Sequence, residues 1–322
     1  MLTSFFGKSS PVNYLLLGIF IIIAAVIAIF SSEIHDITEL VVAKYSFVIL
    51  GSVFSMLLLD FIIRKNELTM GNTYAVFLFS CFLVSFPMVF LEPKLICATI
   101  LILLAQRRIF SLASEKNRSK KILDAALYIT LASFFYFPSI GFLLFLFFVI
   151  LKYSGFHIKM LLVALVGVLL AAVLTVTYSL LVNDSVDWMF SWFKPVSFDF
   201  SSYNNLNVLL PVTIITSITI WTGLHKLYKL PSLPKKEHSK ATLALVLMLI
   251  SAAVTAASPA KTGAEALFML PALAVLSANY IAYRKQEAHR SDTKTTFWLK
   301  ELLLWSALLL SLLAFFMTQL LS

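Results

Sequence analysis

Long apolar stretches alternate with short polar ones along almost the whole chain. Windows of about 20 residues select apolar segments near 14–30, 45–63, 73–91, 95–106, 124–138, 139–151, 160–182, 208–224, 241–258, 266–283 and 301–321. At 1.5 Å per helical residue, about 20 residues cross the roughly 30 Å hydrocarbon core of a bilayer. Unpaired backbone groups in lipid cost several kcal/mol, so each segment should be helical. The pattern predicts an all-α polytopic transmembrane bundle of about eleven helices.

The composition agrees with a chain embedded through most of its length. Apolar residues make up 60% and charged residues only 13%, whereas about a quarter of a soluble domain is charged. The short pair at 124–151 forms either two crossings or one bent hairpin around Pro138. No polar stretch exceeds about 25 residues, too few for a separate core. We therefore expect a single integral-membrane domain over 1–322, with a possible seam at 225–240 between helices 1–8 and 9–11.

The positions of Lys and Arg predict the orientation. If the N-terminus is cytoplasmic, the outer connections hold only four of the 25 basic residues, namely Lys44, Lys94, Lys194 and Lys261. Basic residues concentrate on the cytoplasmic side of membrane proteins, so we expect a cytoplasmic N-terminus. The net charge of +9 then reflects topology and contact with anionic lipid head groups. The basic residues are spread over several loops, so we expect no nucleic-acid partner.

The apolar segments carry almost no chemistry of their own. The chain contains no P-loop, no His-Glu-x-x-His and no Cys-x-x-Cys motif, which argues against an ATP-driven pump or a zinc protease. Asp60 is the one acid inside an apolar run, one helical turn from Arg64. An i,i+4 pair at the membrane edge is favoured over a coupling-ion site. A secondary transporter is correspondingly less favoured.

The first outer loop places acids and a histidine directly after the first helix. Glu33 and Asp36 at i,i+3 would share one face of a short interfacial helix, with His35 beside them. One interpretation is a solvated acidic loop. The other is a carboxylate general base, or a metal-binding pair, at the membrane surface.

Two later outer loops also contain candidate binding residues. Lys261 and Glu265 bracket the entry to a late helix that Pro271 would bend; Lys261 could hold a phosphate, or the pair could belong to a polar turn. Asp187, Trp188 and Trp192 suit either an aromatic belt at the lipid head groups or stacking on a sugar ring.

Several short motifs resemble the GT-C superfamily of integral-membrane glycosyltransferases. They are Ser85-Phe86-Pro87, the turn Glu92-Pro93-Lys94, the aromatic stretch 134–138 and the late entry 261–271. The family's arginine in that last motif is replaced here by Leu267, and the first outer loop is short.

The resemblance implies a sugar donor linked to a polyprenyl phosphate. By position, Glu33 or Asp36 would be the base and Lys261 would hold the carrier phosphate. The substrate-binding candidates are His35, Lys261, Glu265, Asp187, Trp188 and Trp192. A divalent cation is the one cofactor that the resemblance allows, and no protein metal site is expected otherwise.

The N-terminal stretch Met1–Lys8 and the general sequence style resemble a multi-pass inner-membrane family of Bacteroidota, which implies a bacterial inner membrane. We expect a GT-C-like glycosyltransferase acting at the periplasmic face. The alternatives are a non-catalytic scaffold within an envelope-assembly or secretion complex, with membrane-protein partners, and a small-molecule permease. A catalyst requires Glu33, Asp36, Lys261 and Glu265 to converge on one outward cavity.

Overall fold

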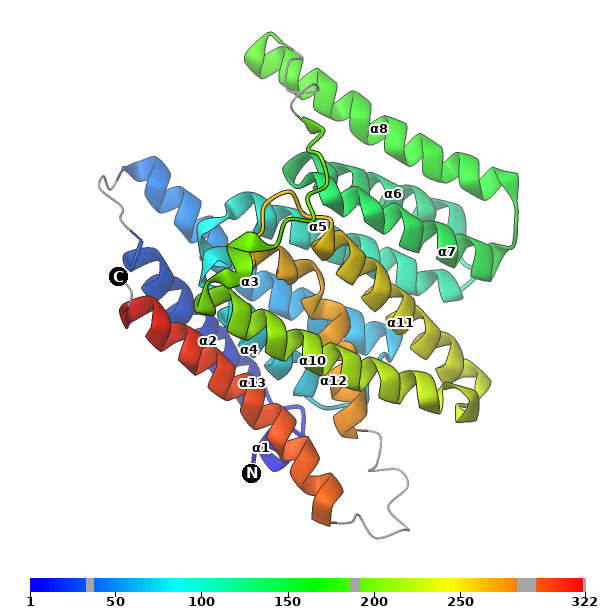
Figure 1. Ribbon diagram of the computed structural model, residues 1–322. Coiled ribbons are helices and arrows are strands. Elements are labelled where there is room, and N and C mark those ends of the chain that lie inside the picture. The colour runs from blue at the N-terminus through cyan, green and yellow to red at the C-terminus, as the bar shows by residue number, and fades with distance from the viewer. Residues whose placement is uncertain (33–37, 186–191, 283–293, 321–322) are drawn as a thin grey trace.

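The computed structural model describes residues 1–32, 38–185, 192–282 and 294–320, and these residues form helices and turns without a strand (Figure 1). The α-helices are α1 (Leu2–Phe5), α2 (Pro11–Phe30), α3 (Glu39–Asn66), α4 (Tyr74–Val84), α5 (Pro93–Phe110), α6 (Arg118–Phe135), α7 (Phe142–Ser154), α8 (Ile158–Asn183), α10 (Leu206–Lys229), α11 (Lys235–Ala256), α12 (Leu270–Ala282) and α13 (Lys294–Leu320). Short 3-10 turns are η1 (Pro87–Leu91), η2 (Ser111–Ala113), η3 (Phe137–Gly141), η4 (Ser201–Asn204), η5 (Leu230–Ser232) and η6 (Ala264–Phe268).

Eight of the described helices are long and apolar enough to cross a membrane. Two further apolar helices, α4 and α12, are shorter. The prediction of a helical membrane protein is therefore confirmed at this level, whereas the count of about eleven crossings and the cytoplasmic N-terminus stay predictions.

Prolines mark where several helices begin or end. Pro11 and Pro93 occupy the first position of α2 and α5, where the missing N–H breaks no helical bond. Pro87 begins η1, three residues after the last residue of α4. Pro271 is the second residue of α12, so it does not bend that helix in its interior, contrary to the prediction. The pair at 124–151 forms two helices, α6 and α7, joined by η3.

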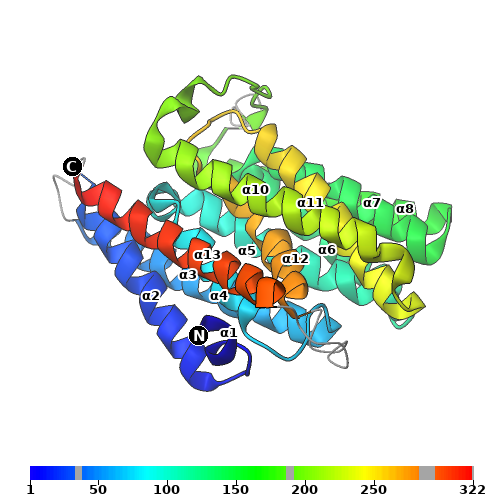
Figure 2. The same ribbon diagram turned by 60° about the horizontal axis from the view of Figure 1, so that its bottom comes forward.

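The centre of the bundle is built from the two short helices. Every residue of α4 is buried, as are most residues of α12, and these helices pack against each other. Both lie in the middle of the bundle in the two views of Figures 1 and 2. The helices before and after the loop 225–240 contribute to one hydrophobic cluster, because α12 and α13 pack against α4.

Helix α8 lies at one edge of the bundle and packs mainly on α6 (Figure 1). Only 11% of the most apolar 18-residue stretch of α8 is buried inside the bundle. Gly167 is the closest point of approach: a Cβ there would lie 2.7 Å from the Leu123 carbonyl oxygen and 2.9 Å from the Ala126 Cβ. Small residues allow this kind of close helix packing in membranes.

Polar contacts hold the ends of several helices. Arg64 Nε lies 2.8 Å from Asp60 Oδ2 on α3, which confirms the predicted i,i+4 pair, and Tyr14 donates to the same carboxylate. At the N-terminus, the buried Glu301 of α13 accepts hydrogen bonds from the peptide N–H of Leu2 and of Thr3. These bonds satisfy N–H groups at the start of α1.

Candidate functional site

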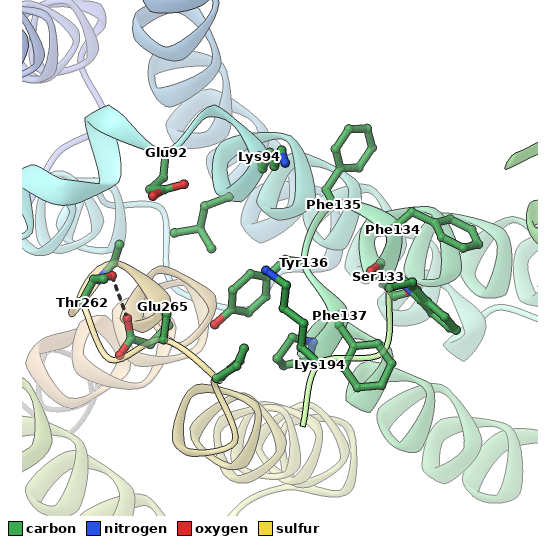
Figure 3. Close-up of a pocket in the computed structure, with 16 residues that line it drawn as sticks. Glu92, Lys94, Ser133, Phe134, Phe135, Tyr136, Phe137, Lys194, Thr262 and Glu265 are labelled. Carbon is green, nitrogen blue, oxygen red and sulfur yellow. Dashed lines mark hydrogen bonds between the residues drawn. The ribbon is translucent and has the colours of Figure 1, made fainter. Parts of the chain in front are cut away.

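A pocket of about 590 Å³ opens where four connections meet at one end of the bundle (Figure 3). The connections are the α4–α5 turn, the α6–α7 turn, the segment leading from α8 to α10, and the α11–α12 turn. All four belong to the loops that the charge pattern predicts to face outward. The lining residues are Glu92, Lys94, Leu95, Ser133, Phe134, Phe135, Tyr136, Phe137, Pro138, Trp192, Lys194, Pro259, Ala260, Thr262, Ala264 and Glu265.

Glu265 supplies a buried, oriented carboxylate to this pocket. Its side chain is 2% exposed; Tyr203 donates to Oε1, and Thr262 Oγ1 donates to Oε2 at 3.3 Å. Burial and the hydrogen bond to Glu265 raise the pKa of Tyr203. The Tyr203 hydroxyl therefore stays protonated at neutral pH and keeps donating. Each carboxylate oxygen has a second lone-pair direction available for a ligand.

Tyr136 forms the floor beside that carboxylate. Its ring stacks on Phe268 with centroids 5.1 Å apart, and its hydroxyl is hydrogen-bonded to Ser258. Burial raises the pKa of Tyr136, and the negative charges of Glu265 and Glu92 act in the same direction. In Figure 3 the hydroxyl points toward Glu265. A neutral phenol and a carboxylate thus lie next to each other.

A glycine shapes the turn that presents Glu265. Gly263 has φ +86°, and a Cβ there would lie 3.0 Å from Val208 Cγ1 and 3.2 Å from Phe86 Cδ1. The left-handed conformation costs an ordinary residue roughly 1–2 kcal/mol. Only glycine fits this backbone without strain, so the sequence at 262–265 turns sharply into η6.

Two lysines and a second carboxylate stand on the pocket wall. Lys94 and Lys194 are exposed and have no ion-pair partner among the described residues. Figure 3 shows the Lys194 side chain extending into the pocket that Tyr136 also lines. Glu92 precedes the first residue of α5 and lies on the opposite wall. The pocket therefore combines positive and negative groups around an aromatic floor.

Trp192 closes the aromatic side of the pocket. Its indole N–H donates to the Ser133 carbonyl oxygen at 2.7 Å. The ring centroid lies 5.3 Å from that of Phe134 and 5.1 Å from that of Phe137. The hydrogen bond uses a carbonyl in the last turn of α6, which has no partner within the helix. Trp192 is therefore fixed in place, as a binding wall requires.

Lys261 lies outside the pocket lining and points elsewhere. Its Nζ donates to the carbonyl oxygens of Ala256 at 2.6 Å and Thr255 at 3.5 Å, and it lies 4.7 Å from the centroid of the Phe200 ring. The side chain is 5% exposed, and burial lowers its pKa. A cation at the last carbonyls of α11 is favourable to the helix dipole. In this structure Lys261 caps a helix.

The structure brings together only part of the predicted site. Glu265 and Trp192 share one pocket. The predicted residues Glu33, His35, Asp36, Asp187 and Trp188 lie outside the described residues, so their convergence with Glu265 stays a prediction. Within the described ranges, no group of three or more His, Cys, Asp or Glu side chains could hold a metal ion.

Sequence reasoning did not select four residues that line the pocket, namely Glu92, Lys94, Tyr136 and Lys194. A signal for the two lysines was present, because they are among the few basic residues in predicted outer loops. A basic residue on the outer side runs against the general bias, which makes it a candidate for ligand binding.

Comparison with protein families gives one match. The model of the family of unknown function DUF6427 matches residues 1–322. The chain belongs to this family. No curated protein and no solved structure matches the chain, so no match supports the resemblance to GT-C enzymes or to a Bacteroidota family.

Proposed function

We propose that this DUF6427 protein is a GT-C-like membrane glycosyltransferase that takes a sugar from a polyprenyl phosphate at the periplasmic face of a bacterial inner membrane. One observation carries the proposal. A single pocket at the ends of the helices combines an oriented carboxylate, Glu265, with a fixed aromatic wall and two lysines that have no ion-pair partner among the described residues. Sugar phosphates offer hydroxyls, an apolar ring face and negative charge, which match these three elements.

The proposed topology has eleven crossings and a cytoplasmic N-terminus. The eight long helices, together with α4, α6 and α12, make up that number. The short α4 and α12 are buried among other helices, so they need not match the full bilayer thickness as a lipid-exposed helix must. With this topology the pocket faces the periplasm, and the loops that are rich in Lys and Arg face the cytoplasm.

The reaction would proceed by displacement at the anomeric carbon. An acceptor hydroxyl forms the new C–O bond while the bond between the anomeric carbon and the phosphate oxygen breaks. The leaving polyprenyl phosphate keeps the electron pair, and Lys94 and Lys194 stabilise its charge. A carboxylate takes the proton of the hydroxyl. The resemblance favours Glu33 or Asp36 for this role, whereas the pocket geometry favours Glu265. Trp192 offers a flat apolar surface to the sugar.

The test is transfer by the purified full-length protein in proteoliposomes. The probes are polyprenyl phosphate mannose and glucose with radiolabelled sugars, and the readout is label lost from the lipid phase. We expect Glu265→Gln to lower the rate at least about 100-fold, and the double variant of Lys94→Gln and Lys194→Gln to raise the KM for the donor. The matched control is Lys44→Gln, an exposed outer lysine outside the pocket.

Parallel Glu33→Gln and Asp36→Asn variants identify which carboxylate is the base. If wild-type protein releases no sugar from any donor, or if none of the carboxylate variants alters the rate, the transferase proposal is wrong. A non-catalytic scaffold would give that result while its variants still assembled with partner proteins.

A further inference from the structure

A second pocket, of about 250 Å³, lies at the opposite end of the bundle. Helices α11 and α12 connect the two ends. Lys236 in the first turn of α11 and Asn279 near the end of α12 line the second pocket, whereas Ala256 and Glu265 lie close to the first pocket. The second pocket is bounded by the loop after α3, the end of α10, the start of α11 and the end of α12. In the proposed topology it faces the cytoplasm, where anionic lipid head groups are concentrated.

Three lysines line this pocket and one carboxylate bridges two of them. Lys236 and Lys240, one turn apart on α11, lie 3.0 Å and 2.9 Å from Glu67 Oε2. These two hydrogen bonds lower the pKa of Glu67 to about 2. The third lysine, Lys226 of α10, has no hydrogen bond or ion pair in the described part of the chain, and the negative charge of Glu237 acts on it from the same lining. The lining holds two carboxylates, Glu67 and Glu237, so the three lysines give it a net charge of one positive unit.

Two residues with unpaired backbone donors line the same pocket. The peptide N–H groups of Thr69 and Met70 donate to no acceptor among the described residues, and both residues line the pocket. Glu67 adopts φ 50° at the end of α3, which turns the loop, and Asn279 Nδ2 holds it by donating to the Leu68 carbonyl oxygen at 3.1 Å. Unpaired loop amides beside lysines are a typical anion-binding arrangement.

We propose that this pocket is a phosphate-binding site, for the head group of an anionic phospholipid or for free phosphate. The Glu67 carboxylate occupies the position between two ammonium groups that a phosphate oxygen would take. Each ammonium has three donors, and Lys236 uses one of them on Glu67. Donors therefore remain on the lysines for a second anion, and Lys226 has all three. This inference does not depend on the glycosyltransferase proposal, since it concerns a different pocket.

The experiment measures binding to the full-length protein in a neutral detergent. The probes are dihexanoyl phosphatidylglycerol, dihexanoyl phosphatidylcholine as the zwitterionic control, and inorganic phosphate, each titrated by calorimetry below its micelle concentration. We expect saturable binding of phosphatidylglycerol and at least a tenfold weaker affinity for Lys226→Gln. Lys235→Gln is the matched control, because this exposed lysine lies on α11 outside the pocket and the variant removes the same charge.

Two further variants keep the result unambiguous. Lys226→Arg retains the charge and should retain binding, so a loss seen only in Lys226→Gln is not a folding defect. Glu67→Gln frees both lysines of α11 and should tighten binding. If inorganic phosphate displaces phosphatidylglycerol at similar concentrations, free phosphate is sufficient to occupy the site. If inorganic phosphate does not displace it, the site binds the lipid. Equal effects of Lys226→Gln and Lys235→Gln, or no saturable binding of either anion, would overturn the proposal.

Discussion

The close contact between α6 and α8 at Gly167 leaves no room for one added methyl group. A Cβ added at Gly167 meets the Leu123 carbonyl oxygen at 2.7 Å and the Ala126 Cβ at 2.9 Å. Carbon atoms in contact prefer about 3.5–4.0 Å. Gly167→Ala therefore requires α8 to move away from α6 by roughly 1 Å. The Leu123 carbonyl oxygen and the Leu127 nitrogen belong to the backbone of α6 and cannot rotate aside.

The size of the effect follows from two opposing contributions. Overpacking of a well-packed contact costs typically about 1–3 kcal/mol. Replacing glycine by alanine within a helix stabilises the folded protein by up to about 1 kcal/mol. Gly223 in α10 has nothing within 4 Å of its added Cβ, so Gly223→Ala has only the second contribution. The difference between the two variants isolates the overpacking cost, about 1–3 kcal/mol.

In a Cys97→Ser background, which leaves Cys81 as the remaining thiol, unfolding can be followed through the buried thiol of Cys81 with a thiol-reactive fluorophore, in a titration with denaturing detergent. Amide exchange along α8 gives a second, local readout. We expect Gly167→Ala to unfold earlier and to exchange faster in α8, and Gly223→Ala to match or exceed the wild type. Equal midpoints for the two alanine variants would show that α8 does not approach α6 this closely.

Two other predictions concern the polar contacts at the helix ends. Glu301→Gln removes one of the two carboxylate oxygens that accept from the N–H groups of Leu2 and Thr3. Leaving such an N–H group unsatisfied costs about 1–3 kcal/mol, so amide exchange at the N-terminus should become faster. Glu39→Gln changes an exposed acid and serves as the unaffected control. Glu67 has a pKa lowered from 4.5 to about 2 by two lysines. The depressed carboxylate pKa means that its contribution to stability is complete above pH 4.5 and is lost as the pH falls toward 2. Glu67→Gln should flatten the pH dependence of the unfolding midpoint in that window, and an unchanged profile would contradict the ion-pair geometry.

The fold class could be predicted because burial in lipid imposes one secondary structure on any long apolar stretch. Helix lengths were harder to predict. The segment near 73–91 is apolar throughout, yet α4 ends at Val84 and the 3-10 turn η1 follows from Pro87. A hydropathy window averages over such a break. The Asp60–Arg64 pair was predictable for the opposite reason, since its geometry depends only on spacing within one helix.

The candidate site was predictable only at the level of loops. Charge placement predicted five outer connections, and four of these connections meet at the pocket. The direction of a side chain depends on tertiary neighbours, which no local pattern encodes. Lys261 points to the end of α11 instead of into the pocket, whereas Lys194, on the segment before α10, lines the pocket.

The burial of α4 on every side has a consequence for how the protein is made. An eleven-residue helix is too short to be held in a bilayer by its own hydrophobicity, for which about 20 residues are needed. Its packing partners α12 and α13 come much later in the chain and are synthesised after it. The ribosome must therefore complete α12 and α13 before the middle of the bundle can close. Quality-control proteases would meet an open intermediate until then, so C-terminal truncations should be degraded during biogenesis rather than accumulate as smaller bundles.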